Sequence, residues 1–248
     1  MDNVSQKPVA VITGASRGVG AATALLLASR GWNITITCSS TIKEANEIAS
    51  ACEEHNVEAL AIQADVSKDA DCKDTINQTI NKWGRIDALI NNAGTSKFAW
   101  DHSDLDQLNA EDFQKIYAVN LIGPFQMVKA AKKYLMQSSN PSITNVSSIA
   151  GIKGIGSSMA YAASKGALNT MTISMARNLG PIRVNAVCPG FIEGEWLKNG
   201  LGEETYNSAK DHLESSVPLK SVASPASIAE SIMAFTELNK NATGQLLI

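Results

Sequence analysis

The chain alternates short apolar segments with longer segments of helical periodicity, and this alternation restricts its fold more than any other feature. Seven short runs are predicted as strands: Val9–Thr13, Ile34–Thr37, Ala59–Gln63, Ala88–Asn91, Ser142–Val146, Arg183–Val187 and Gln245–Ile248. The predicted helices are Ala21–Ser29, Lys43–Glu54, Asp69–Lys82, Ala110–Gln137, Tyr161–Leu179 and Ala226–Leu238. Strands that are apolar almost throughout belong to parallel sheets covered on both faces. The sequence therefore predicts an α/β fold, a doubly wound parallel sheet with helices on both faces.

Length and charge narrow the protein class further. The 248 residues contain no Pro- or Ser-rich linker, so residues 1–248 are predicted to form a single domain with its own core. The net charge of −3 argues against nucleic-acid and membrane-surface partners, which select a marked basic excess. No apolar run is long enough to span a membrane, and no signal peptide is visible, so we expect a cytoplasmic protein.

The cysteines and histidines show no metal-binding spacing. No CxxC pair occurs, and the three histidines are widely separated, so no metal site is predicted. In a reducing compartment we expect buried or half-buried free thiols at Cys38, Cys52, Cys72 and Cys188.

Two stretches interrupt the alternation. Thr95–Asn109 is predicted as a polar loop with scattered aromatic residues. Phe191–Pro218 follows a Pro-Gly turn and mixes acids, glycines and a few large side chains, among them Glu193, Glu195, Trp196 and Leu197. Long loops in compact folds are usually lids or binding loops, so residues 191–218 are predicted to form a substrate lid.

A glycine-rich segment directly follows the first predicted strand. Residues 13–20 read TGASRGVG, and a helix begins at once. Glycines allow the backbone to turn tightly and to approach a pyrophosphate, whose negative charge is favoured at a helix N-terminus. A plain strand-to-helix connection is the alternative, but the position after the first strand of a βα series favours a dinucleotide.

A tyrosine and a lysine are spaced for joint acid–base chemistry. Tyr161 and Lys165 are four positions apart, so on a helix both side chains lie on one face. A free tyrosine has a pKa near ~10, and a neighbouring ammonium group favours the phenolate. The pair could thus act as a general acid or base, although an isolated Tyr-x-x-x-Lys is often incidental.

With these motifs in order, the chain resembles the short-chain dehydrogenase/reductase family, whose members carry the TGxxxGxG form on a Rossmann-type sheet. NNAG at residues 91–94 and PGFI at 189–192 also match. The resemblance implies an NAD(P) site, and its residues here are expected to be Gly14, Ser16, Arg17, Gly18, Val19, Gly20, Ser39, Asp65, Val66, Asn92, Ala93, Gly94, Tyr161, Lys165, Pro189, Gly190 and Ile192.

The preference for NAD or NADP is set by residues near the end of the second predicted strand. NAD-preferring Rossmann proteins place an acid there to bind the ribose hydroxyl. Residues 37–40 read TCSS, with no acid, and Arg17 is a nearby cation, with Lys43 a second candidate. Small hydroxyls and a cation would accept a 2′-phosphate, so NADP(H) is favoured and NAD(H) stays possible.

The resemblance also assigns catalytic roles. Ser148, thirteen residues before Tyr161, is expected to hydrogen-bond the substrate carbonyl; Ser147 is the alternative, but the offset selects Ser148. Asn120 is expected to kink its helix and to hold a water that relays protons to Lys165. Tyr161 would transfer the proton, and Lys165 would also bind the nicotinamide ribose.

Within the family, the overall pattern is similar to 3-oxoacyl-[acyl-carrier-protein] reductases. Members that use a carrier protein present basic residues near the site, whereas this chain has QSSN at 137–140 and LGP at 179–181. An acyl carrier protein is therefore a doubtful partner, and a small carbonyl or alcohol substrate fits at least as well. Gly194 stands where the family often has Thr, and the last predicted strand reaches residue 248 without the usual Gly-rich tail.

The sequence thus predicts an NADP(H)-dependent reductase of a 3-oxoacyl thioester or small ketone, with Tyr161 as general acid/base. An NAD(P)-dependent secondary alcohol or sugar dehydrogenase is the alternative within enzymes. A non-catalytic cofactor-binding regulator is the alternative outside them. The resemblance also implies a homotetramer or homodimer formed through the two long helices.

Overall fold

Seven parallel strands form one sheet in the order β3-β2-β1-β4-β5-β6-β7. The structure is a computed structural model, and it describes residues 7–40 and 42–248. The strands are β1 (Val9–Ile12), β2 (Asn33–Cys38), β3 (Ala59–Gln63), β4 (Ala88–Asn91), β5 (Ser142–Val146), β6 (Arg183–Val187) and β7 (Leu246–Leu247). The predicted fold class is confirmed, and four of these strands have the predicted bounds.

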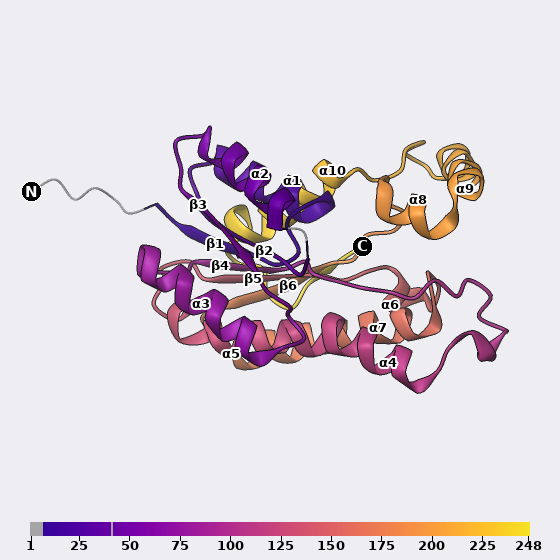
Figure 1. The fold of residues 1–248 in the computed structure, drawn as a ribbon, viewed down its shortest axis with the longest axis horizontal. Coiled ribbons are helices and arrows are strands. Elements are labelled where there is room, and N and C mark those ends of the chain that lie inside the picture. The colour runs from indigo at the N-terminus through magenta and orange to yellow at the C-terminus, as the bar shows by residue number, and fades with distance from the viewer. Residues whose placement is uncertain (1–6, 41) are drawn as a thin grey trace, which may run out of the picture.

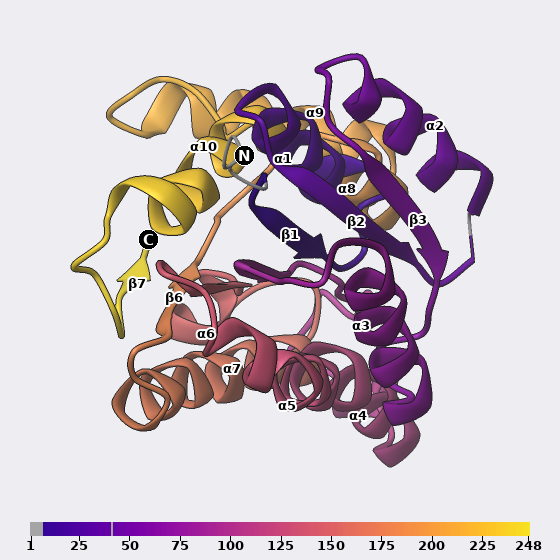
Figure 2. The same cartoon turned by 90° about the vertical axis from the view of Figure 1, so that its left-hand side faces the viewer.

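Helices cover both faces of the sheet (Figures 1 and 2). One face carries α1 (Gly18–Ser29), α2 (Ile42–Glu53) and α10 (Pro225–Met233), and the other carries α3 (Asp69–Trp83), α5 (Gly123–Leu135) and α7 (Met159–Asn178). Alternate strand residues serve the two layers, since Ile12 packs into the core on the α1 side and Val11 into the core on the α3 side. This period of two explains why the strands are apolar almost throughout.

The helix predicted over Ala110–Gln137 forms over Ala110–Leu135, but a π-helical turn interrupts its regular α-helical course. The chain forms α4 (Ala110–Tyr117), then a π-helical turn η2 (Ala118–Ile122), then α5. A β-carbon built on Gly123 would lie 2.8 Å from Cγ2 of Val66, so α5 packs too closely on this segment for any larger residue. Another π-helical turn, η3 (Ala234–Leu238), follows α10. Such turns shift the helix face by a residue, which hydrophobic periodicity does not reveal.

The segment after β6 is helical and not a plain loop. It forms α8 (Glu195–Leu201) and α9 (Glu203–Ser216), which lie beyond the carboxyl ends of the strands in Figure 1. Tyr206 is the one residue of α9 that is buried, so α9 lacks the apolar stripe that predicts a helix. The Thr95–Asn109 stretch is a loop, as predicted, with a single 3₁₀ turn, η1 (Leu105–Gln107), and a short helix α6 (Ala150–Lys153) follows β5.

The strand order places a candidate functional site at the carboxyl ends of the central strands. The chain builds β1, β2 and β3 outward, then returns to place β4 on the other side of β1. Connections after β1 and β4 therefore leave in opposite directions at their carboxyl ends, where open α/β sheets bind ligands.

The four cysteines are buried and form no disulfide with one another, as predicted. Among the described residues, no helix combines the length and hydropathy that crossing a bilayer requires. The same residues contain no cluster of three or more His, Cys, Asp or Glu side chains that could hold a metal ion.

Candidate active site

A hydrogen-bonded clasp joins the glycine-rich turn to the end of β4. The hydroxyl oxygen of Thr13 accepts hydrogen bonds from the backbone N–H groups of Asn92 and Ala93, each at 3.0 Å. The side-chain amide of Asn92 donates back to the carbonyl oxygens of Thr13, at 2.9 Å, and Gly14, at 2.8 Å. Asn92 and Ala93, predicted as cofactor residues, thus fix the shape of the turn. Thr13 was not predicted as a site residue, although it stands in the motif.

The glycines of this turn are required by geometry. Gly14 has φ +62°, and a β-carbon there would lie 2.8 Å from Cα of Ala93. A β-carbon on Gly20 would lie 2.5 Å from the side-chain nitrogen of Asn92. Gly18 also has a positive φ, and α1 begins at this residue. The turn therefore presents the first N–H groups of α1, which is a suitable place for an anion.

The residues predicted to bind the 2′-phosphate lie beside this turn. The N–H of Ala15 donates to the carbonyl of Thr37 at 2.9 Å, which ties the turn to the end of β2. Arg17, at the N-terminal end of α1, and Ser39, just after β2, are both exposed. Lys43 lies 4.0 Å from Glu47 in an exposed ion pair, so it is less suited to this role.

Asp65 and Val66 shape the turn after β3. The carboxylate of Asp65 accepts hydrogen bonds from the N–H and hydroxyl of Ser67, and these lower its pKa below the usual value. The carbonyl of Val66 accepts from the side chain of Gln126 at 2.9 Å. The Asp65 carboxylate thus stabilises the local turn, and the predicted cofactor contact of Asp65 and Val66 stays a prediction.

Tyr161 and Ser148 are brought together at the carboxyl edge. The phenol of Tyr161 is hydrogen-bonded to Ser148, and burial raises its pKa to about 12 despite that bond, which lowers it. The hydroxyl of Ser148 also accepts from the N–H of Ala150 at 3.1 Å and donates to the carbonyl of Pro189 at 3.4 Å. Ser147 instead donates to the Lys165 carbonyl at 3.3 Å, so Ser148 is the serine that faces Tyr161.

Lys165 is a buried cation on the same face of α7. Its side chain donates to the carbonyl of Val146 at 2.8 Å, and Nζ lies 5.6 Å from the ring centroid of Tyr161. Burial lowers its pKa to about 8, opposed by the neighbouring Cys188. The expected lowering of the Tyr161 pKa by this ammonium group is not found in the protein alone, where burial raises that pKa and Ser148 is the group that lowers it.

Asn120 lies within the π-helical turn and links three segments. Its side-chain nitrogen donates to the Thr95 carbonyl, at 2.9 Å, and to the Ser164 hydroxyl, at 3.0 Å, and its oxygen accepts from the N–H of Thr95 at 2.8 Å. A β-carbon built on Gly94 would lie 3.6 Å from the Asn120 side-chain oxygen and 3.7 Å from Lys165 Nζ. Asn120, Gly94 and Lys165 therefore line one small space. The interruption of the helix at Asn120 agrees with the predicted kink.

The PGFI segment closes the site from the β6 side. The Pro189 carbonyl accepts from the Ile149 N–H at 2.9 Å as well as from Ser148. Gly190 is exposed, and Ile192 forms an isolated parallel bridge with Ala223. Gly194 lies at the N-terminal end of α8, and its N–H donates to the hydroxyl of Tyr206 at 3.2 Å.

Three aromatic residues form a cluster that reaches Tyr161; Trp196 was predicted as part of the substrate lid, whereas Phe98 and Trp100 were not predicted as site residues. Phe98 and Trp100 belong to the Thr95–Asn109 loop, and Trp196 belongs to α8. The ring centroids of Trp196 and Tyr161 are 6.2 Å apart. Their signal was available, since only 5% of residues are aromatic and these three fall in the two stretches that break the βα alternation.

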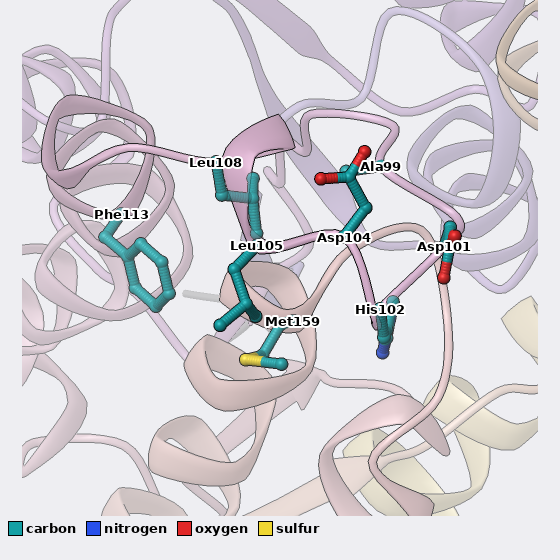
Figure 3. Close-up of a pocket in the computed structure, with 8 residues that line it drawn as sticks. All are labelled: Ala99, Asp101, His102, Asp104, Leu105, Leu108, Phe113 and Met159. Atoms are coloured by element: carbon teal, nitrogen blue, oxygen red, sulfur yellow. The ribbon is translucent and has the colours of Figure 1, made fainter.

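A small cavity of about 160 Å³ lies beside the site, lined by Ala99, Asp101, His102, Asp104, Leu105, Leu108, Phe113 and Met159. In Figure 3 the side chains of Leu105 and Met159 converge between the loop and the first turn of α7. Ligand sites usually measure roughly 300–1,000 Å³, and no predicted site residue lines this cavity. It is therefore too small to be the substrate site.

A sequence model of the short chain dehydrogenase family matches residues 8–204. The chain belongs to the short-chain dehydrogenase/reductase family. It is accordingly an oxidoreductase that acts on CH–OH or carbonyl groups with NAD(P).

Among its relatives, the chain is 35% identical over 244 residues to a Streptomyces violaceoruber protein designated ketoacyl reductase 2 of the granaticin polyketide synthase, covering 98% of this chain and 94% of that one. A solved structure assigned to this family from Burkholderia xenovorans has a TM-score of 0.89 and 43% identity, with 98% and 96% of the two chains covered. A structure titled NAD⁺-bound xylitol dehydrogenase has a TM-score of 0.88 and 27% identity, with 98% of each chain covered.

The residues at the sheet edge fit a dinucleotide. The glycine-rich turn places the first N–H groups of α1 where an anion can bind, and close packing of Gly14 and Gly20 against Ala93 and Asn92 fixes the shape of the turn. Lys165 is 3% exposed, and its ammonium group can donate three hydrogen bonds, of which one goes to Val146. A buried cation with further donors suits hydroxyl or phosphate oxygens of an NAD(P) molecule.

We predict that Lys165 of the cofactor-free protein titrates near pH 8, because burial disfavours its charged form, and that it is charged below this pH. NMR of protein labelled at the lysine ε-carbon would measure this, with the signal identified by its loss in Lys165→Met. Lys198 is the matched control, since the neighbouring Glu203 raises its pKa. A Lys165 midpoint at or above that of Lys198 would contradict the prediction.

Proposed function

We propose that the protein is an NADP(H)-dependent reductase that converts a carbonyl compound to a secondary alcohol, with Tyr161 as the proton donor. The observation that supports this most directly is the Ser148–Tyr161 hydrogen bond beside buried Lys165, at the sheet edge that carries the glycine-rich turn. Hydride transfer is the chemistry that a bound nicotinamide supplies. The protein residues provide binding, orientation and the proton.

The protonation state of Tyr161 favours the reductive direction. A phenol with a pKa of about 12 holds its proton at neutral pH, so it can donate a proton to the oxygen of a carbonyl that is being reduced. Oxidation of an alcohol needs the phenolate instead. The phenolate requires added positive charge nearby, because Lys165 does not offset the effect of burial on Tyr161 in the protein alone.

Ser148 and Asn120 support this transfer in different ways. Ser148 already bonds the phenol, so its hydroxyl can orient a carbonyl oxygen at the same point. Asn120 fixes Thr95 and Ser164 around the space shared with Gly94 and Lys165. We assign Asn120 to positioning that space, in which a water can connect Lys165 to solvent.

The NADP(H) preference rests on charge at the end of β2. A carboxylate would repel a 2′-phosphate, and residues 37–40 contain none, while exposed Arg17 offers a guanidinium group that suits phosphate. NAD(H) with a sugar alcohol is the second candidate, favoured by the similarity to the NAD⁺-bound xylitol dehydrogenase structure.

The charge around the site favours a small carbonyl substrate over one carried by an acidic protein. The loop before η1 carries Asp101 and Asp104, which line the small cavity beside the site. The lysines of this loop and of α8 are already paired, Lys97 with Asp112 at 2.7 Å and Lys198 with Glu203 at 2.8 Å. An acidic partner would meet like charge here. Because the chain is similar to a ketoacyl reductase, a 3-oxoacyl thioester that is not attached to a carrier protein stays a candidate substrate.

We further propose a homodimer or homotetramer that associates through η2, α5 and α7. Ile122 and Phe125 are 48% and 51% exposed and lie on an apolar groove of about 560 Å³. The other residues of the groove are Leu121, Ala167, Thr170, Met171 and Ser174. Exposed apolar patches of this kind mark interaction surfaces.

Tyr161→Phe should lower kcat/KM for carbonyl reduction with NADPH by about 10²-fold or more, because the general acid is removed while the ring is kept. Steady-state rates against acetoacetyl thioesters, simple ketones and keto sugars would measure this. Tyr134→Phe, far from the sheet edge on α5, is the control and should retain wild-type rates. Undiminished turnover in Tyr161→Phe would refute the assigned proton donor.

Arg17→Ala should weaken NADPH use by about tenfold or more, because a charge-assisted contact with the 2′-phosphate is lost, and should change NADH use little. The ratio of kcat/KM for the two cofactors reports this directly. Arg177→Ala removes an exposed cation from α7 and serves as the control. Equal or better rates of the wild type with NADH would overturn the NADP(H) assignment.

Phe125→Asp should shift the protein toward the monomer, because it places a charge in the apolar groove. Sedimentation equilibrium over a range of protein concentrations would show the change in mass. Leu219→Asp, at a side chain that is 87% exposed, should leave the assembly intact. A wild-type protein that is monomeric at high concentration would exclude the proposed assembly.

A further inference from the structure

Four aromatic rings form a continuous row that ends on Tyr161. The centroid distances are 5.5 Å from Trp100 to Phe98, 5.2 Å from Phe98 to Trp196, and 6.2 Å from Trp196 to Tyr161. All three pairs are tilted, and they fall within the range in which aromatic pairs attract one another. We call Phe98, Trp100 and Trp196 the aromatic wall. The wall joins the loop after β4 to helix α8, and the catalytic phenol lies at its end.

The wall is held in place from both sides. The indole N–H of Trp100 donates to the Gly200 carbonyl of α8 at 3.2 Å. On the other side, the N–H of Ala99 donates to the Ser157 carbonyl, and the Ser96 and Ser157 hydroxyls are hydrogen-bonded, both at 2.6 Å. Ser157 directly precedes Ser158, which lies at the N-terminal end of the helix that carries Tyr161. Phe98 is therefore fixed between the lid and the catalytic helix.

Gly200 is the residue that permits this packing. A β-carbon built on Gly200 would lie 2.1 Å from two ring carbons of Phe98, far inside van der Waals contact. Gly200 lies near the end of α8, where its φ is not positive, so no backbone strain requires glycine there. The absence of a side chain at position 200 thus sets where the Phe98 ring stands.

The wall leaves aromatic surface uncovered beside Tyr161. Trp196 is 45% exposed and Trp100 is 41% exposed, although each touches Phe98. Exposed aromatic side chains that cluster next to a reactive group are a binding surface, because flat rings stack on them with more affinity than their area alone provides. The loop that carries Phe98 and Trp100 also carries Asp101 and Asp104, so an anionic substrate would meet like charge on this loop.

We propose that the aromatic wall is the specificity determinant of the carbonyl site and that it selects ketones with a flat aromatic ring next to the reacting carbon over linear 3-oxoacyl thioesters. This inference rests on the proposed reduction by Tyr161. Phe98 and Trp196 contact the substrate ring, and Gly200 is a positioning residue that acts through Phe98. A linear thioester lacks a ring to stack on the wall.

Gly200→Ala is the sharpest variant, because it displaces Phe98 without touching Tyr161, Ser148 or Lys165. Alanine is a better helix former than glycine, so α8 should not be weakened by the exchange itself. Asn199→Ala, at an exposed residue of the same helix, is the matched control. The neighbours of Gly200 could move to accommodate the methyl group that Gly200→Ala introduces, and Phe98 would then stay in place. Phe98→Leu is therefore a second variant, because it removes the ring directly.

The first measurement is the ratio of kcat/KM for propiophenone to that for acetoacetyl-N-acetylcysteamine, with NADPH. The wild type and Asn199→Ala should favour propiophenone, and Gly200→Ala and Phe98→Leu should lower the ratio roughly tenfold. Thermal melts should show that all variants remain folded. An unchanged ratio in both wall variants would overturn the proposal while leaving carbonyl reduction intact.

The second measurement is binding without turnover, by quenching of tryptophan fluorescence with propiophenone. The wild type should show saturable quenching that is lost in Trp196→Leu and weakened in Gly200→Ala, but retained in Asn199→Ala. If no carbonyl is reduced, the proposed function fails, and this quenching still decides whether the wall binds an aromatic ketone. Equal quenching in the wild type, Trp196→Leu and Gly200→Ala would refute the wall as a binding surface.

Discussion

A parallel sheet covered by helices on both faces can display polar groups only at the ends of its strands. Here every residue of β1, β2, β4, β5 and β6 is buried, so the chemistry of the chain is confined to the sheet edge. The residues that follow the strands carry it: the glycine-rich turn after β1, Asn92 after β4, Ser148 after β5 and Pro189 after β6. The clasp between Thr13 and Asn92 joins the two central strand ends, so the cofactor turn and the catalytic segment keep a fixed relation.

At the same carboxyl ends of the strands, Lys165 places a charged group in a buried position. Lys165 is almost fully buried, and the Val146 carbonyl partly compensates the cost of removing its ammonium group from water. The remaining cost lowers the pKa of Lys165 to about 8, and burial raises the pKa of Tyr161 to about 12. The two pKa shifts have the same cause and opposite directions, since burial favours the neutral phenol and the neutral amine alike.

Sequence reasoning predicted the elements whose pattern is local. The strands β3, β4, β5 and β6 begin and end where their apolar runs do, because burial on both faces leaves a continuous signal. The same reasoning missed the π-helical turn at Asn120 and the helices α8 and α9. The turn shifts the helix by one residue where α5 meets Val66, and α9 buries little besides Tyr206, so neither has an amphipathic signature of its own.

The sequence by itself determined the parallel sheet, the position of the glycine-rich turn, and the Tyr161–Lys165 pair on one helix face, since each depends on neighbours a few residues apart. The offset to Tyr161 had selected Ser148 over Ser147, and the tertiary structure agrees, since Ser148 acts on the phenol of Tyr161 while Ser147 donates to the Lys165 carbonyl. The tertiary structure alone brought Phe98 and Trp196, almost a hundred positions apart, to within 5.2 Å beside the catalytic ring. Contacts between residues so far apart in the sequence depend on how the loops pack together beyond the strand ends. The position of the Phe98 ring, for example, depends on the missing β-carbon of Gly200, which leaves no pattern in the local sequence.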